Sequence, residues 1–271
     1  MGYKTGGLYP DWYLVSNGQK NNMPELKLVF SETFCTFSRK IPRKAALPYL
    51  LTRRATVKDI IESVGVPHPE VGEIWWEGRL VDFTFIPEHE GVVTVNPVSA
   101  PFDVTVPSLL RPVAFKQVRF IADINVGKLA ILLRMLGLDT ALKPNYKDAD
   151  IARCSENDQR IVLSKDVGLL KHRRITHARY VRAIHPDGQL REVVRFFGLS
   201  PPYNAFSRCI RCNSQLIPVP KEQILHRLEP KTRKYFHRFK ICPDCDRIFW
   251  KGSHHQLMKQ RLLQADIRFS E

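Results

Sequence analysis

The sequence predicts an α/β protein built from several modules, and three observations support this. Between residues 118 and 200, apolar segments of strand length alternate four times with segments of helical spacing, which is typical of a mostly parallel sheet with right-handed crossovers. Two CxxC pairs follow, and a different succession of strands and one helix precedes. We expect a flexible tail at 1–23, an α+β domain at 24–98, a linker at 99–117, an α/β domain at 118–200, a zinc ribbon at 201–262 and a second tail at 263–271.

Positive charge is concentrated in the second part of this 271-residue chain. The chain carries 42 Lys and Arg and 27 Asp and Glu; residues 1–110 hold 11 and 12 of them, which leaves 31 and 15 for residues 111–271. This asymmetry indicates a polyanionic partner, nucleic acid before membrane, with a generally basic solvated surface as the alternative. No apolar run approaches the roughly 20 residues that span a bilayer, and no signal peptide is evident. We therefore expect a soluble, cytoplasmic protein.

The N-terminal module shows the element order of a β-grasp. Leu26, Leu28 and Phe30 alternate as in a strand. Thr56 can cap a helix that Gly65 ends. Further strands are expected at 46–52, 74–76, 80–86 and 92–95.

The stretches WWEGRLVDF and EGVVTVNPV make this module resemble the ubiquitin-like modules related to sulfur carriers. Such carriers end in a free Gly-Gly, whereas here Val95-Asn96-Pro97 continues into more chain. Sulfur transfer is therefore disfavoured. The remaining alternatives are a module that docks a protein or positions RNA, and a scaffold that packs on its neighbour.

The central domain delivers an aspartate after each expected strand. The strands are expected at 119–122, 139–143, 160–164 and 179–183, and the helices at 127–136, 149–156, 167–172 and 189–197. In a parallel sheet the site lies at the carboxyl ends of the strands. The acids that follow these strands are Asp123, Asp148, Asp150, Asp166 and Asp187.

Each of these aspartates alone is an ordinary helix cap. Together they would repel one another unless protons or cations intervene, and an all-oxygen set suits Mg²⁺ or Mn²⁺. A carboxylate cluster ringed by cations suits a phosphodiester, because the metal activates water while Lys and Arg hold the backbone. The candidate cations near this edge are Lys128, Lys147, Lys165, Lys171, Arg173 and Arg174.

The cysteine pairs predict a structural zinc site. Cys209/Cys212 and Cys242/Cys245 supply four thiolates, which match tetrahedral zinc and leave no open position for catalysis. The segment between them is basic and contains Tyr235, Phe236 and Phe239. These rings are candidates for stacking on bases, with packing against the ribbon as the alternative. His254 is a further candidate for contacting RNA, with a structural or surface role as the alternative.

From about Lys116 to Arg261 the chain resembles the Mut-seven C-terminal RNase family, which joins a PIN-like nuclease domain to a zinc ribbon. The matching stretches are FIADINVGKLA, LRMLGLDT, DADI, RIVLSKDVGLLKHRR, QLREVVRFFGL, RCIRCNSQL, PVPKE and CPDCDRIFWKGSHHQLM. The family often carries an N-terminal ubiquitin-like module, as seen here from about Pro24. The resemblance thus covers nearly all of the chain outside the tail.

This resemblance implies a metal-dependent RNase with an acidic site. By position, the family's three carboxylates match Asp123, Asp148 and Asp166. Asp150 stands where a neighbouring acid is frequent, and Asp187 matches a fourth acid more loosely. Two departures lie beside the site: Ser164 replaces a Thr and keeps its hydroxyl, and Asn125-Val126 replaces Met-Leu.

Our leading hypothesis is a ribonuclease that hydrolyses RNA at this aspartate cluster with Mg²⁺ or Mn²⁺, with zinc in the ribbon and with Lys128 and Lys165 holding the strand. The alternative is a non-catalytic RNA- or ribosome-binding adaptor whose ubiquitin-like module docks a protein. The adaptor should bind RNA in a salt-dependent manner even without the aspartates.

Overall fold

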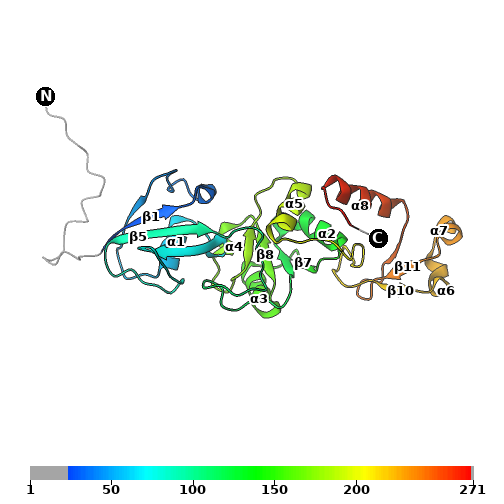
Figure 1. Ribbon diagram of the computed structural model, residues 1–271. Coiled ribbons are helices and arrows are strands. Elements are labelled where there is room, and N and C mark those ends of the chain that lie inside the picture. Colours follow the sequence, from blue (N-terminus) through cyan, green and yellow to red (C-terminus); the bar gives the residue numbers. More distant parts are fainter. Residues whose placement is uncertain (1–23, 270–271) are drawn as a thin grey trace, which may run out of the picture.

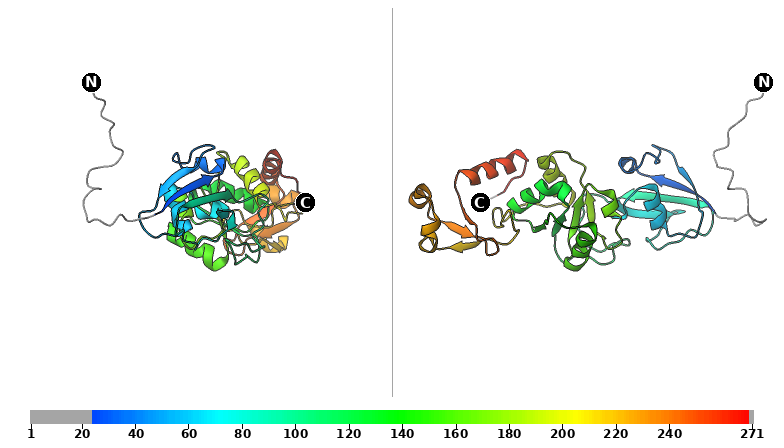
Figure 2. Two further views of the ribbon diagram at one scale, coloured as in Figure 1. Left: turned by 60° about the vertical axis from the view of Figure 1, so that its left-hand side comes forward. Right: turned by 180° about the vertical axis from the view of Figure 1, so that it is seen from behind.

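The computed structural model describes residues 24–269, in which three units follow one another in a row (Figure 1, Figure 2). The N-terminal β-grasp module lies at one end, the parallel α/β domain in the middle and the ribbon at the other end. The tail expected at 1–23 lies outside the described residues. No helix within 24–269 has both the length and the apolar character needed to cross a membrane.

The N-terminal module is a five-stranded sheet covered by one helix. Its strands, in the order β2-β1-β5-β3-β4, include a central parallel pair formed by β1 and β5. Alternation in β1 buries Leu26 and Leu28 against the helix, as period-two patterning requires. The elements are β1 (Glu25–Phe30), η2 (Glu32–Thr36), β2 (Leu47–Leu50), α1 (Val57–Val64), η3 (His68–Glu70), β3 (Val71–Trp76), β4 (Arg79–Leu80) and β5 (Gly91–Pro97).

One strand of this module is shorter than the sequence predicts. β4 ends at Leu80, whereas a strand was expected over 80–86. The Asp82 carboxylate accepts hydrogen bonds from the backbone N–H and the hydroxyl of Thr84, at 2.8 and 2.6 Å. This local turn satisfies the backbone in place of a sheet ladder.

The central domain has the four expected strands and four expected helices. Its strands are all parallel, in the order β7-β6-β8-β9. The expected second strand, 139–143, is reduced to the two residues of β7. The elements are β6 (Phe120–Ala122), η4 (Ile124–Val126), α2 (Gly127–Met135), β7 (Thr140–Ala141), α3 (Asp148–Asp158), β8 (Ile161–Ser164), α4 (Val167–Leu170), β9 (Ala178–Tyr180) and α5 (Pro186–Phe196).

Both faces of this sheet are covered, so its strands read as continuous apolar runs. Phe120 and Leu163 belong to the core that includes α2 and α5. Ile121 and Val162 point to the opposite face and pack with α3 and α4. At the carboxyl ends of β6 and β8 these apolar runs give way to the polar side chains of Asp123 and Ser164.

The segment 99–117, expected as a linker, is packed between the two domains. Val104 and Phe115 lie in the core of the α/β domain, and Leu110 lies in the core of the N-terminal module. The buried Arg111 donates hydrogen bonds to the carbonyls of Pro69, Val71 and Thr176, at 2.7, 3.0 and 3.1 Å. The segment therefore ties the two domains together.

A buried polar network completes this interface. Glu70, with 3% of its surface exposed, forms ion pairs with Arg179 at 3.2 Å and Arg182 at 2.8 Å. Its second oxygen accepts from the backbone N–H of Tyr180 at 2.8 Å, which covers the edge of β9. His68 Nε2 lies 2.6 Å from the carbonyl of Ile175.

The ribbon contains a three-stranded antiparallel sheet and precedes a long helix. Its elements are β10 (Ile217–Val219), α6 (Lys221–Ile224), η5 (Leu225–Arg227), α7 (Pro230–Tyr235), β11 (Phe239–Ile241), β12 (Ile248–Trp250) and α8 (Ser253–Gln264). Phe239 is buried in the ribbon core, and the half-buried Phe236 packs against it. Tyr235 remains exposed.

A tail was expected at 263–271, but its described part, residues 263–269, is packed on the α/β domain. α8 extends to Gln264 and packs against α5 (Figure 1). Ala265 and Ile267 are buried in the core of the α/β domain, and Phe269 packs against it. The apolar side chains at alternate positions hold this segment on the domain.

Candidate functional site

The candidate site lies where the strand order of the parallel sheet reverses. The chain passes from β6 to β7 on one side and then returns to β8 on the other side of β6. The carboxyl ends of strands on either side of such a reversal form the usual binding crevice of an open α/β sheet. Pairing of Ala122 with Leu163 brings the two following residues, Asp123 and Ser164, next to each other.

The Asp123 carboxylate is held by two neutral donors. Its Oδ2 accepts hydrogen bonds from the Ser164 hydroxyl at 2.7 Å and from Asn125 Nδ2 at 2.5 Å. The side-chain oxygen Oδ1 of Asn125 accepts a hydrogen bond from the Lys165 backbone N–H at 3.1 Å, which fixes the orientation of the Asn125 side-chain amide. No cation lies within ion-pair distance of Asp123 among residues 24–269. The Asp123 carboxylate is thus oriented but its charge is not neutralised by the protein.

Asp123 also occupies the N-cap position of η4, but its side chain accepts no hydrogen bond from a backbone N–H group of that helix. The alternative in which Asp123 is an ordinary helix cap is therefore not supported. Its second oxygen, Oδ1, accepts no hydrogen bond from the described residues. That oxygen is available to a ligand outside the protein.

Asp166 follows β8, and the Ser164 hydroxyl links it to Asp123 by hydrogen bonds. Its backbone N–H donates to the Ser164 hydroxyl at 2.9 Å. Its Oδ1 caps α4 by accepting from the N–H groups of Gly168 at 2.7 Å and Leu169 at 3.2 Å. The capping role is real here, and it leaves the other carboxylate oxygen without a partner in the described chain.

The other three aspartates have different settings. Asp150 accepts from the Lys147 backbone at 3.2 Å and pairs with Arg153 at 2.5 Å. Asp187 pairs with Arg261 of α8 at 3.2 Å. Asp148 is exposed at the start of α3, and no contact joins it to Asp123.

The five aspartates do not form one tight cluster. Within 24–269, the four cysteines are the only set of three or more Cys, His, Asp or Glu side chains whose ligand atoms all lie within 4.8 Å of one another. A three-carboxylate site with direct coordination is therefore not assembled. Mg²⁺ usually keeps several waters and binds through one or two carboxylates. The free oxygens of Asp123 and Asp166 fit that more modest requirement.

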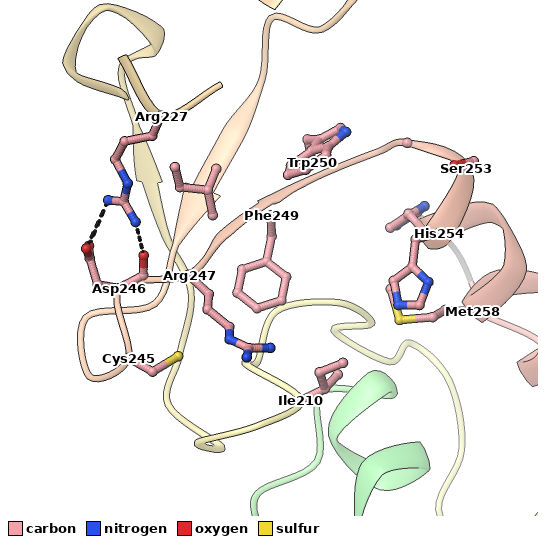
Figure 3. A pocket seen from close by; sticks show the side chains of 13 residues that line it. Ile210, Arg227, Cys245, Asp246, Arg247, Phe249, Trp250, Ser253, His254 and Met258 are labelled. Carbon is pink, nitrogen blue, oxygen red and sulfur yellow. Dashed lines mark hydrogen bonds and ion pairs between the residues drawn. The ribbon is translucent and has the colours of Figure 1, made fainter. Parts of the chain in front are cut away.

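The predicted RNA-contacting cations divide into two groups. Lys165 Nζ donates to the carbonyl of Ala183 at 2.8 Å, and Arg174 pairs with Glu156 at 3.6 Å. Lys128 and Arg173 are exposed and pair with no acid in the described chain. His254 is exposed and lines a groove between the ribbon and α8 (Figure 3).

The four cysteines meet as the sequence predicts. Cys209 Sγ and Cys245 Sγ are 3.7 Å apart, and a tetrahedron with Zn–S bonds of about 2.3 Å has edges of about 3.8 Å. Burial, followed by the neighbouring Cys245 and Cys209, raises the pKa of the Cys212 thiol to about 12. Four thiols this close need a cation before all can ionise, so the donor set fits structural zinc.

Two features of the site escaped the sequence interpretation. Asn125 entered it only as a replacement beside the first acid, whereas the structure makes it a donor to Asp123. An amide two residues after a strand-end carboxylate is the signal that was available. Arg247 and Phe249, which line the groove beside His254, carried no such signal because their shared face depends on the ribbon sheet.

Comparison with known proteins assigns the two main parts of the chain. Residues 118–262 match the family model of the Mut7-C RNase domain, and residues 23–103 match that of the Mut7-C ubiquitin domain. No curated protein and no solved structure matches the chain. The family's nuclease-like domain coincides with the parallel sheet that carries Asp123 and with the four-cysteine ribbon. The chain therefore belongs to the Mut7-C RNase family and carries that family's ubiquitin-like module at its N-terminal side.

Proposed function

We propose that this protein is a ribonuclease that hydrolyses RNA with the help of Mg²⁺ or Mn²⁺ at Asp123. One observation carries the proposal. Asp123 lies at the reversal of the strand order, fixed by Ser164 and Asn125, with its charge left unpaired in the described chain. Structural carboxylates are normally matched by protein donors and cations, so an oriented and unmatched one favours an external cation.

Asp123 and Asp166 are the residues that would hold the divalent cation, each through the oxygen that the protein leaves free. A cation bound there would supply Lewis-acid catalysis and lower the pKa of a water molecule. Ser164 and Asn125 keep the Asp123 carboxylate in one orientation. Asp148, exposed at the N-terminus of α3, is the third expected carboxylate and would act through water molecules.

The remaining predicted residues receive different roles in this proposal. Lys128, in the first turn of α2 after Asp123, is exposed without an acidic partner in the described chain, so it is the cation best able to hold the RNA backbone. Arg173 is also exposed and unpaired there, but it lies in the segment that leads from α4 back to the start of β9. Asp150 and Asp187 are neutralised by Arg153 and Arg261 and maintain the scaffold. Lys165 and Arg174 have partners within the protein: Lys165 links the end of β8 to Ala183, and Arg174 pairs with Glu156 of α3.

The domains at either end complete the proposal. Zinc at Cys209, Cys212, Cys242 and Cys245 would hold the ribbon, whose basic surface would bind RNA. The ubiquitin-like module uses η3 to contact the central domain, so a protein partner would bind one of its other faces.

The test compares the purified full-length protein with Asp123→Asn on single-stranded and structured RNA in the presence of Mn²⁺. We expect cleavage by the parent protein and a loss of at least about 10³-fold in the variant, because the isosteric amide cannot hold the cation. Asp150→Asn is the matched control, and it should retain activity. Equal cleavage by the parent and Asp123→Asn would refute the role of Asp123.

The same experiment addresses the adaptor alternative. An adaptor would cleave no RNA under any of these conditions and would bind it in a salt-dependent manner. Its binding would survive Asp123→Asn and would strengthen slightly, because a negative charge is removed.

A further inference from the structure

We propose that the groove between the ribbon and α8 binds single-stranded RNA, with Phe249 stacking on a base and Arg247 contacting a phosphate. The inference rests on the proposed function in one respect, namely that RNA is the substrate. It adds a second contact for the RNA, on the ribbon side of the central domain, and it predicts a preference for unpaired bases.

The groove is a real hollow of about 620 Å³. One wall is the end of the ribbon sheet and the other is the first part of α8, including Ser253, His254 and Met258 (Figure 3). Trp250 is packed tightly against Gly252, where an added Cβ would lie 2.6 Å from the indole nitrogen. The turn between the two walls therefore requires glycine at position 252.

The groove is lined by an aromatic ring, Phe249, and a cation, Arg247. Phe249 lies in β12 and Arg247 immediately precedes that strand, two residues from Phe249, and both line the groove. Lys240 on β11 is the register partner of Phe249, on the same face of the sheet. Ile248 points the other way into the ribbon core. Figure 3 shows the Phe249 ring and the Arg247 guanidinium directed into the space before α8.

This combination matches the chemistry of unpaired RNA. Bases of any kind stack on an aromatic face while cations hold the backbone. Arg227 is engaged by Asp246, at 3.0 Å, but Arg247 pairs with no acid among residues 24–269. Residues 201–262 contain 13 Lys and Arg against 4 Asp and Glu. This excess of positive charge favours a polyanion, and not an uncharged apolar peptide, as the occupant of the groove.

The groove is connected to the aspartate edge by α8. The helix begins in the groove, and its Arg261 pairs with Asp187 in the first turn of α5. Seven residues of helix separate His254 from Arg261, which is about 10 Å along the axis. The segment before α5 lies beside the end of β8, because Lys165 donates to the Ala183 carbonyl. A single RNA strand could therefore follow α8 from the groove toward Asp123.

The test measures binding separately from cleavage. A fluorescent 12-nucleotide unstructured RNA is titrated with full-length protein carrying Asp123→Asn, in buffer without added divalent cations or chelators, so that zinc is retained. Phe249→Leu keeps an apolar side chain but removes the ring, and Tyr235→Leu is the control for an exposed aromatic of the same ribbon. Arg247→Gln and Arg238→Gln form the corresponding pair for charge.

We expect Phe249→Leu to weaken binding by about 5- to 100-fold, as loss of a base–aromatic stack does. Arg247→Gln should weaken binding and reduce the slope of log affinity against log salt by about 0.7. The two controls should stay within about twofold of the parent. A duplex of the same sequence should be insensitive to Phe249→Leu, because its bases are already stacked. Zinc content and thermal unfolding would establish that each variant is folded.

Parental affinity in both Phe249→Leu and Arg247→Gln would overturn the proposal, as would equal losses in the groove variants and their controls. Either variant alone is sufficient for this decision if the other fails to fold. The proposed ribonuclease function is judged independently by cleavage with intact Asp123. Absence of cleavage together with weakened binding in Phe249→Leu would reject the enzyme and keep the groove.

Discussion

Glu70 and Asp123 are both carboxylates fixed by short hydrogen bonds, but their surroundings differ in kind. Glu70 is buried between two domains, and its charge is matched by Arg179 and Arg182. Asp123 lies at the open end of a sheet and receives hydrogen bonds only from the neutral groups of Ser164 and Asn125. Hydrogen bonding orients both groups, whereas neutralisation by the protein occurs only at Glu70. The difference separates a carboxylate that holds the fold from one that, in the proposed function, would receive an external cation.

The largest expected effect on stability is at Glu70. Glu70→Gln leaves two partly buried arginines without their shared anion, which should cost about 3–5 kcal/mol of unfolding free energy. The matched control is Glu88→Gln, whose exposed pair with Arg54 should contribute less than about 1 kcal/mol. Denaturant unfolding of both variants measures the difference. Similar small losses in the two would remove the structural half of the comparison.

Ser164→Ala tests the orienting role at the site. Removing the hydroxyl frees the Asp123 carboxylate on one side, and loss of a group that supports a metal ligand typically lowers activity or metal affinity by about 10–100-fold. Ser155→Ala is the control, because its buried hydroxyl donates to the Arg160 carbonyl at 2.7 Å, away from the site. RNA cleavage at several Mn²⁺ concentrations is the measurement. Undiminished cleavage in Ser164→Ala would argue that Asp123 needs no second support.

The domain interface should also respond to pH. His177 is buried against Phe115, with ring centroids 4.1 Å apart; burial, followed by the nearby Arg111, lowers its pKa to about 3. As the pH falls, His177 therefore takes up a proton near pH 6.5 in the unfolded chain but stays neutral in the folded chain until the pH approaches 3. The resulting stability is present above pH 6.5 and is lost as the pH falls from 6.5 toward 3, by about 1.4 kcal/mol per unit.

Thermal or denaturant unfolding at pH 7.5 and 5.5 checks this expectation. His177→Gln should lose about 1.4 kcal/mol less than the parent protein between the two values. His89→Gln, at an exposed histidine, should behave like the parent. An unchanged pH dependence in His177→Gln would mean that another group causes the loss.

The smallest expected effect on stability is at Asp123 itself. Because no protein cation pairs with this carboxylate in the described chain, Asp123→Asn should change the unfolding free energy by less than about 1 kcal/mol. The same unfolding assay used for Glu70→Gln measures it. A loss as large as that of Glu70→Gln would make Asp123 a structural residue and erase the contrast between the two regions.

Several features could be predicted because they depend on local patterns. The apolar runs predicted all four strands of the parallel sheet, and the spacing of Thr56 and Gly65 predicted the limits of α1. The CxxC pairs predicted a four-cysteine cluster, which is confirmed. The roles of the aspartates were less accessible. Asp150 and Asp187 were also candidates for the site from their positions after the strands, and their contacts with Arg153 and Arg261 set them apart from Asp123.

The segments outside the regular elements were also beyond local patterns. Residues 99–117 contain prolines and no period, so they read as a linker, yet Arg111 joins both domains with three hydrogen bonds. Burial of a guanidinium depends on carbonyls that belong to residues far away in the chain. Burial of Ala265 and Ile267 likewise depends on distant residues, because their side chains reach the core of the central domain only when α8 is in position.

The sequence by itself determined the kind and order of the elements, the positions of aspartates after the strands, and the four cysteines that cluster. Periodicity and short spacings specify these features because they act over a few neighbouring residues. The tertiary structure decided which of the acidic charges are paired with cations, as at Asp150 and Asp187, and how the unpaired Asp123 is oriented. That decision depends on pairs such as Asp123 with Ser164, 41 positions apart, whose distances are set only when two strands take their register.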